Sequence, residues 1–215
     1  MLTNPTPHLF WITSRAAGFA ALILASLAVS VGLLMSTKLL RRGGGERAPI
    51  HEALSLSAIA AIVVHGAALL GDGFLHPSLA DITIPFVSSY KSAWTSIGIV
   101  AGWSTILLGL SYYARRMIGS TRWRKLHRFT ALAWLLGLVH ALGEGTDAGQ
   151  LWFLAMVALV AIPALGLLVA RLLGGGGGAA RTAQQTAGAG PSFAARQGEA
   201  AVEVSSARIP ARSGA

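Results

Sequence analysis

The chain has 215 residues, of which 53% are hydrophobic and 12% charged, and its mean hydropathy is +0.61. Long apolar runs with so few charges exclude a soluble globular domain and are typical of transmembrane helices. The absence of cysteine excludes disulfides, thiolate-ligated iron–sulfur clusters, cysteine-based zinc sites and the C-x-x-C-H attachment of c-type heme. The net charge of +9 lies mostly in loops between apolar runs, so it indicates membrane topology and no nucleic-acid binding.

Five apolar segments follow one another, each long enough to cross a bilayer. They cover residues 9–36, 51–70, 94–113, 127–142 and 151–173. The fourth is short, and the basic stretch before it, residues 123–126, extends it into the membrane interface. The first is long, lacks an A-x-A cleavage site and is followed directly by cations, so we expect it to be an uncleaved helix. We therefore expect an all-α membrane protein, a bundle of five transmembrane helices in a lipid bilayer.

The connections between these segments indicate orientation. Cations gather after the first segment, between the third and fourth, and after the fifth. The other connections carry the acidic residues Asp72, Asp81, Glu144 and Asp147. Basic loops stay on the cytoplasmic side of a membrane. We expect a multi-pass protein of the plasma (inner) membrane with its N-terminus outside and its C-terminus in the cytoplasm.

Composition divides the chain into three parts. Residues 1–8 form an N-terminal segment, and residues 9–173 hold the five helices. From residue 174 a run of glycines leads into a stretch rich in Ala, Gly, Gln, Ser and Arg. Such a stretch cannot bury enough apolar surface to fold alone. Residues 174–215 are therefore expected to form a disordered cytoplasmic tail.

Four histidines lie in the second and fourth segments. His51 and His65 are 14 residues apart, and His127 and His140 are 13 apart. Both segments begin on the cytoplasmic side, so His51 and His127 share one depth and His65 and His140 another, about 20 Å away. A spacing of 13 leaves His140 about 140° from His127 around an ideal helix. The fourth segment is therefore either a distorted helix, with Gly137 as one place where the distortion could occur, or a helix with the two hemes on different sides.

Imidazoles inside a membrane are costly unless they pair, bond or ligate. Heme iron has two axial positions that suit neutral imidazole, and histidines on facing helices can hold one porphyrin between them. Zinc is an alternative, although it takes about four ligands and each depth offers two. A proton relay is another, although only Glu52 supplies a carboxylate, at a helix end. His8 and His76 lie outside this arrangement and are expected at the surface.

The pattern resembles the ferric reductase-like transmembrane domain family, which includes ferric reductases, NADPH oxidases and the heme-binding membrane subunit of the bacterial methionine sulfoxide reductase system. The two histidine spacings carry the resemblance, with local similarity to short actinobacterial-type members in ITIPFVSSYKSAWTSIG (82–98), WRKLHR (123–128) and GEGTDAG (143–149). It covers roughly residues 9–173. It implies two b-type hemes, an inner one on His51 and His127 and an outer one on His65 and His140.

The resemblance implies an oxidoreductase component that passes electrons across the membrane. No G-x-G-x-x-G motif follows a strand, so the flavin and nicotinamide domains of ferric reductases are not expected here. A cytoplasmic flavin reductase or a quinone would then be the donor, and an extracytoplasmic reductase or flavoprotein the acceptor. The alternatives are a heme-binding sensor or assembly subunit without turnover, and a small carrier that uses the histidines for protons or metal ions.

Heme propionates favour cationic partners. The candidates near the inner heme include Arg124 and Arg128, with Arg47 and Lys125 beside them, although topology alone also requires cations there. Arg15 lies at the outer end of the first segment, where it either pairs with a propionate or snorkels to the interface. The outer loop from Asp72 to Ala93 contains the apolar ITIPFV, which either caps the outer heme and docks an acceptor or rests on lipid headgroups.

Overall fold

The computed structural model describes residues 8–36, 46–145 and 147–188, and these residues contain helices and no strand. The helices are α1 (Leu9–Ser36), α2 (Arg47–Leu69), α3 (Leu79–Thr83), α4 (Ser92–Leu110), α5 (Arg115–Ile118), α6 (Ser120–His127), α7 (Thr130–Glu144) and α8 (Leu151–Gly188). Five stretches are long and apolar enough to cross a membrane: Leu9–Ser36, Arg47–Leu69, Ser92–Leu110, Ser120–Glu144 and Leu151–Leu173. The expected all-α fold with five spans is confirmed, while its orientation stays a prediction.

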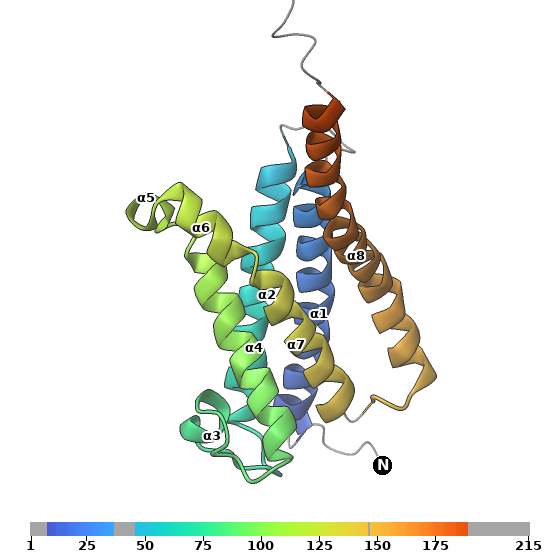
Figure 1. Ribbon diagram of the computed structural model, residues 1–215. Coiled ribbons are helices and arrows are strands. Elements are labelled where there is room, and N and C mark those ends of the chain that lie inside the picture. Colours follow the sequence, from blue (N-terminus) through green and yellow to red (C-terminus); the bar gives the residue numbers. More distant parts are fainter. Residues whose placement is uncertain (1–7, 37–45, 146, 189–215) are drawn as a thin grey trace, which may run out of the picture. The chain divides into compact units, whose positions relative to one another are not determined.

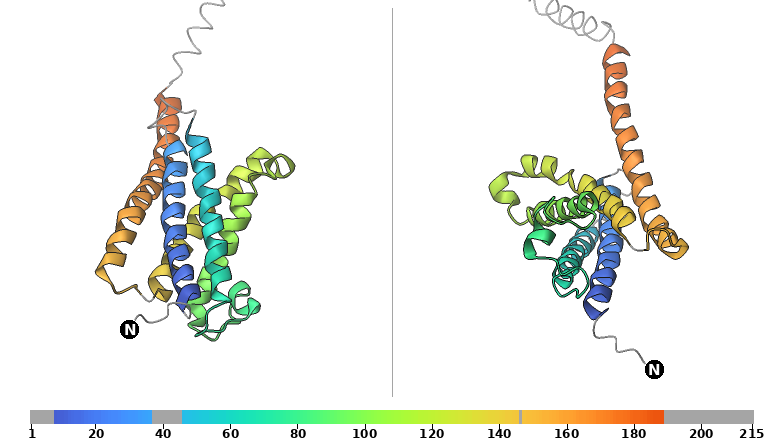
Figure 2. Two further views of the ribbon diagram at one scale, coloured as in Figure 1. Left: turned by 180° about the vertical axis from the view of Figure 1, so that it is seen from behind. Right: turned by 90° about the horizontal axis from the view of Figure 1, so that it is seen from below.

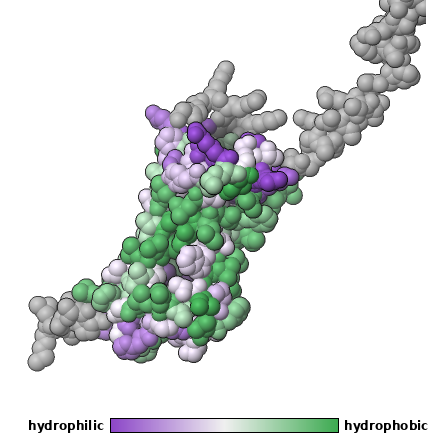
Figure 3. Space-filling model, turned by 90° about the vertical axis from the view of Figure 1, so that its left-hand side faces the viewer, coloured by the Kyte–Doolittle hydropathy of each residue, from purple (hydrophilic) through white to green (hydrophobic). Residues whose placement is uncertain are grey.

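These spans are helical because their sequences are predominantly apolar and long enough to cross a bilayer. In a bilayer every backbone N–H and C=O must find a partner inside the protein, and a helix satisfies them within one segment. Large apolar side chains on several helices remain more than half exposed, among them Val63, Leu107, Leu132 and Leu159. On the face shown in Figure 3, hydrophobic residues form a broad middle band and hydrophilic residues gather at both ends. That distribution fits helices surrounded by lipid.

Within residues 1–169 the spans associate in two antiparallel pairs. α1 lies along α2, and α4 lies along α7, as the views in Figures 1 and 2 show. The pairs meet more sparsely, through α1 with α7 and α2 with α4. Small buried residues such as Ser14, Ala17, Ala21 and Ala58 let helix backbones approach closely. The histidine-bearing helices α2 and α7 therefore belong to different pairs.

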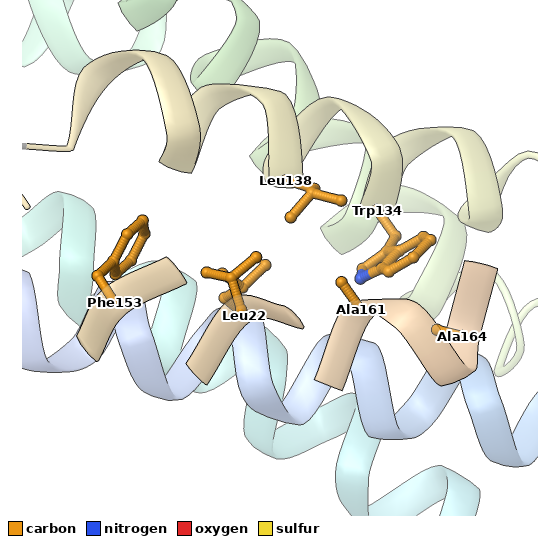
Figure 4. Close-up of a cluster of buried hydrophobic side chains, with 7 residues drawn as sticks. Leu22, Trp134, Leu138, Phe153, Ala161 and Ala164 are labelled. Carbon is orange, nitrogen blue, oxygen red and sulfur yellow. The ribbon is translucent and has the colours of Figure 1, made fainter. Parts of the chain in front are cut away.

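A second contact surface joins α1, α7 and the first half of α8. Its buried side chains include Leu22, Trp134, Leu138 and Phe153 (Figure 4). The Trp134 Nε1–H donates to the Ser26 hydroxyl at 2.9 Å, and that hydroxyl donates to the Leu22 carbonyl at 2.7 Å. Both polar groups are buried and both are satisfied, as an apolar environment requires. This core fixes α7 against α1 on the side away from α4.

The fourth span is not one continuous helix. α6 ends at His127, a turn occupies Arg128 and Phe129, and α7 begins at Thr130. The Thr130 hydroxyl donates to the His127 carbonyl at 2.7 Å, while the Ala131 N–H turns to the Arg128 carbonyl at 3.4 Å. The Thr130 hydroxyl thus bonds the carbonyl that the Ala131 N–H would bond in a continuous α-helix. The Ala131 N–H instead bonds the carbonyl three residues before it, as in a 3₁₀ turn.

The interruption explains how a spacing of 13 residues serves both histidines, because His127 and His140 stand on two helices, α6 and α7. Of the two alternatives that the spacing leaves open, a distorted segment is the one present, and its place is the Arg128–Phe129 turn rather than Gly137. No protein atom lies within 4 Å of a Cβ built on Gly137.

α8 continues past Leu173 to Gly188, so the structure describes residues 174–188 as helix. The division of the chain at residue 174 stays a prediction. The rest of the predicted tail, residues 189–215, lies outside the described residues, as do residues 1–7 of the predicted N-terminal segment.

Candidate functional site

The four histidines meet in two pairs, each across the gap between α2 and the fourth span. The ring centres of His51 and His127 are 6.1 Å apart, with 88° between the ring planes. The ring centres of His65 and His140 are 6.4 Å apart, with 71° between the planes. These are the two pairings predicted from the spacings. We call them the His51–His127 level and the His65–His140 level.

The separation of the rings matches what two axial ligands of one metal ion require. A metal–imidazole nitrogen bond is about 2 Å long, and each nitrogen lies about 1 Å from its ring centre, so two rings on opposite sides of one ion stand about 6 Å apart. Among the described residues no hydrogen bond engages the Nε2 atom of any of the four histidines. Both levels therefore fit a bis-imidazole group such as heme.

Backbone carbonyls of neighbouring helices orient three of the four imidazoles. His51 Nδ1 lies 2.9 Å from the Ala28 carbonyl oxygen, His65 Nδ1 lies 2.8 Å from that of Ser14, and His140 Nδ1 lies 2.9 Å from that of Trp94. A carbonyl oxygen only accepts, so Nδ1 must carry the proton in each of the three. In this tautomer the Nε2 atom is unprotonated and has a free lone pair, so the neutral imidazole can ligate a metal through Nε2.

A glycine stands four residues after each of these carbonyls. A Cβ built on Gly18 would lie 3.1 Å from His65 Nδ1, and one on Gly32 would lie 3.1 Å from His51 Cε1. On α4 the contact is tighter, since a Cβ on Gly98 would lie 2.5 Å from His140 Cε1 and Nδ1. The carbonyl and the glycine together form a seat, in which one turn of helix supplies the acceptor and the next leaves room for the ring.

His127 is held differently. Its ring stacks on the indole of Trp123, with 4.9 Å between ring centres and 25° between planes. Tyr112 packs edge-on against the same indole at 5.8 Å. The Nδ1 atom of His127 is buried and has no hydrogen-bond partner among the described residues. An aromatic stack thus takes the place of the carbonyl and glycine for His127.

A hydrogen bond links α2 to the end of α4 beside the His51–His127 level. The Tyr113 hydroxyl donates to the Glu52 carboxylate at 2.7 Å. That bond stabilises the protonated phenol and raises the pKa of Tyr113, and the negative charge of Glu52 adds to the effect. Glu52 therefore already has a partner in this structure.

The described part of the chain holds no group of three or more His, Cys, Asp or Glu side chains placed to share a metal ion. Each level instead presents two imidazoles and no carboxylate. Structural zinc takes four protein ligands and catalytic zinc three. The donor set therefore suits a metal that brings its equatorial ligands with it, as heme iron does in its porphyrin.

Three of the four arginines predicted near the hemes have different surroundings. Arg15 pairs with the Asp147 carboxylate, and its guanidinium also lies 4.3 Å from the centre of the Trp11 ring. Arg124 and Arg128 are exposed on and just beyond α6. Arg15 thus joins α1 to the connection between α7 and α8, while Arg124 and Arg128 belong to the basic end of the bundle. The role of all three toward propionates stays a prediction.

The loop between α2 and α4 does not fold its aromatic side chains over the protein. Phe74 is 87% exposed and Phe86 is 76% exposed. The backbone of Phe86 is left-handed, with φ of 66°. The Phe86 N–H donates to the buried Ser96 hydroxyl at 2.7 Å, which stabilises this conformation. These two rings present apolar surface to their surroundings. The choice between capping the outer heme and resting on lipid headgroups stays a prediction.

Sequence reasoning missed the residues that seat the histidines. Gly18 and Gly32 are 14 residues apart, the same separation as His65 and His51 on the antiparallel neighbour, and that match was a usable signal. Nothing in the sequence marks the carbonyls of Ala28 and Trp94 as acceptors. Comparison of the chain with protein-family models, with curated proteins and with solved structures gives no match. The resemblance to the ferric reductase-like family therefore stays a prediction.

Proposed function

We propose that the chain is a membrane b-type cytochrome, an oxidoreductase component in which each histidine pair holds one heme. The observation that carries the proposal is one geometry repeated at two depths, with 6.1 Å and 6.4 Å between facing imidazoles. A single histidine pair could serve helix packing alone. Two pairs about 20 Å apart along α2 form a sequence of sites from one side of the bundle toward the other.

The chain's own residues bind and orient the group and keep water away from it. Carbonyls and glycines of α1 and α4 fix three imidazoles with Nδ1 protonated, and Trp123 holds the fourth. The spans that surround them are apolar, so they provide a low dielectric environment. When bound, each heme would supply an iron that cycles between two oxidation states and carries one electron.

The predicted topology gives this path a direction through the membrane. It places the His51–His127 level near the cytoplasm, where a flavin reductase or a quinone would be the donor. The His65–His140 level then lies toward the outside, where an extracytoplasmic reductase or flavoprotein would be the acceptor. The location in the plasma (inner) membrane is part of the same proposal.

Electron transfer across a sealed membrane tests this function. Purified protein is reconstituted into vesicles that enclose dithionite, and ferricyanide is added outside as the acceptor. We expect ferricyanide to be reduced faster than in empty vesicles, and we expect His65→Ala and His140→Ala to return the rate to that of empty vesicles. The matched control is His76→Ala, which changes an exposed histidine of the loop outside both levels.

The outcome separates the proposed function from its alternatives. Heme-loaded protein that transfers no electrons would favour a sensor or assembly subunit. Protein that binds no heme but moves protons or metal ions across the vesicle membrane would favour a carrier. Either result would replace the proposal.

A further inference from the structure

The two levels differ in the hydrogen bonds that their imidazoles make. At the His65–His140 level, His65 Nδ1 lies 2.8 Å from the carbonyl oxygen of Ser14 and 3.0 Å from its hydroxyl oxygen, and His140 Nδ1 lies 2.9 Å from the Trp94 carbonyl. At the His51–His127 level, only His51 has such an acceptor, the Ala28 carbonyl at 2.9 Å. His127 Nδ1 is buried without a partner among the described residues.

Ser14 is built to accept from His65. Its side chain is buried, with 3% of the residue exposed. Its hydroxyl donates to the His65 backbone carbonyl at 3.1 Å, so the hydroxyl proton points there and a lone pair is left for the imidazole. The Nδ1–H of His65 is thereby shared between two oxygens of one residue. Ala28, which occupies the corresponding place beside His51, has no second oxygen to offer.

A hydrogen-bond acceptor for Nδ1–H changes how strongly Nε2, the other ring nitrogen, donates to a metal. A hydrogen bond from Nδ1–H draws the proton away from the ring and makes Nε2 a more basic donor toward a metal. A more basic axial ligand stabilises the oxidised metal and so lowers its reduction potential. The His65–His140 level has three such contacts, and the His51–His127 level has one.

We infer that the chain makes its two levels unequal, with the lower reduction potential at the His65–His140 level, and that Ser14 is a positioning residue for this difference. The inference rests on the proposed function, because it concerns hemes held by these histidines. An electron held by the chain would then reside mainly at the His51–His127 level. The identity of the axial residues cannot produce such a difference, because all four are histidines.

The test is a spectroelectrochemical titration of the full-length holoprotein in lipid nanodiscs. His51→Ala leaves only the His65–His140 level loaded, and His65→Ala leaves only the other, so each midpoint potential is assigned to its level. We expect the midpoint of the heme that remains in His51→Ala to be the lower of the two. This comparison does not depend on any change at Ser14.

Substitutions at Ser14 test the cause of the difference. Ser14→Ala should raise the midpoint of the His65–His140 level and leave the other unchanged, while Ser14→Thr, which keeps the hydroxyl, should restore the original value. Ser30→Ala is the control, because the Ser30 hydroxyl donates to the Ser26 carbonyl and touches no histidine.

Two hemes with equal midpoints, or with the reverse order, would overturn the inference and leave the proposed function standing. Equal shifts of both levels in Ser14→Ala would also overturn it, since they would indicate a general structural effect. A holoprotein preparation without any heme would remove the proposed function and this inference together.

Discussion

The imidazole of His127 stacks on the indole of Trp123, with 4.9 Å between ring centres. This contact takes the place of the carbonyl and glycine that hold the other three histidines. Aromatic stacking of this kind contributes about 0.5–1.5 kcal/mol. Trp123→Leu should therefore weaken heme binding at the His51–His127 level by about 2- to 10-fold, measured as the rate of heme loss to apomyoglobin.

Trp152→Leu is the control for that substitution, because Trp152 is half-exposed on α8 and its ring packs against Phe19 and Phe153 rather than against a histidine. Trp123→Phe should show a smaller loss than Trp123→Leu, since it keeps an aromatic face. Faster heme loss at the His65–His140 level, or equal loss in the Trp123 and Trp152 variants, would show that the stack does not position His127.

Gly98 is the tightest of the three glycine seats. Gly98→Ala would place a methyl group 2.5 Å from His140 Nδ1 and Cε1, so the ring or α4 must move. Overpacking of this kind costs about 1–3 kcal/mol. We expect Gly98→Ala to lower heme content at the His65–His140 level, and Gly18→Ala, where the contact is 3.1 Å, to lower it less.

Gly166→Ala provides a matched control in α8, which carries none of the four histidines, because nothing lies within 4 Å of a Cβ at that position. Alanine also favours a helix more than glycine, so this variant should keep both hemes and be equally or more stable. Heme loss in Gly166→Ala to the same degree as in Gly98→Ala would mean that local crowding of His140 is not the cause.

Arg15 and Asp147 form an ion pair between α1 and the connection that follows α7. Their side chains are 30% and 14% exposed, so each loses part of its hydration and depends on the other. Arg15→Gln or Asp147→Asn alone should lower the stability of the protein by about 1–3 kcal/mol, measured by thermal unfolding in detergent. The double variant should lose less than the sum of the single losses.

The same pair of variants separates the structural role of Arg15 from the predicted role toward a propionate. If Arg15 also binds a heme propionate, Arg15→Gln should reduce heme retention more than Asp147→Asn does. Equal heme retention in the two variants would assign Arg15 to the ion pair alone.

Tyr113 reports the contact between α2 and the end of α4. Because its hydroxyl donates to Glu52, the pKa of Tyr113 lies above the ordinary value near 10. A raised pKa means that this bond stabilises the fold below the ordinary pKa and is lost as pH rises through the folded value. In Glu52→Gln the pKa of Tyr113 should fall toward the ordinary value.

The measurement is an ultraviolet titration of the heme-free protein, which has three tyrosines, with Tyr113→Phe used to assign the signal. A titration curve that is the same in Glu52→Gln and in the unchanged protein would mean that the bond does not form in solution.

Much of the fold and the pairing of the histidines could be predicted from the sequence. Apolar runs of membrane length have few other stable structures, so the five spans followed from composition. The two histidine spacings placed His51 beside His127 and His65 beside His140. These predictions succeeded because they depend on helix rise and hydrophobicity, which are properties of the chain alone.

Other features depend on contacts between distant parts of the chain. The turn at Arg128 and Phe129 contains no proline or glycine, and it arises from the hydroxyl of Thr130 competing for a backbone carbonyl. The seat of His140 uses the Trp94 carbonyl, and every residue has a carbonyl. The partner of Arg15 is 132 residues away in sequence. None of these has a local pattern that distinguishes it from its neighbours.

Each of the two histidine pairs is proposed to bind one heme, and the heme content of the purified protein measures this directly. The purified protein, produced with sufficient heme, should contain two b-type hemes per chain and show a Soret band that shifts on reduction by dithionite. His51→Ala and His127→Ala should each lose one heme, and His65→Ala and His140→Ala should each lose the other. A colourless preparation, or a heme content unchanged in all four variants, would contradict the account.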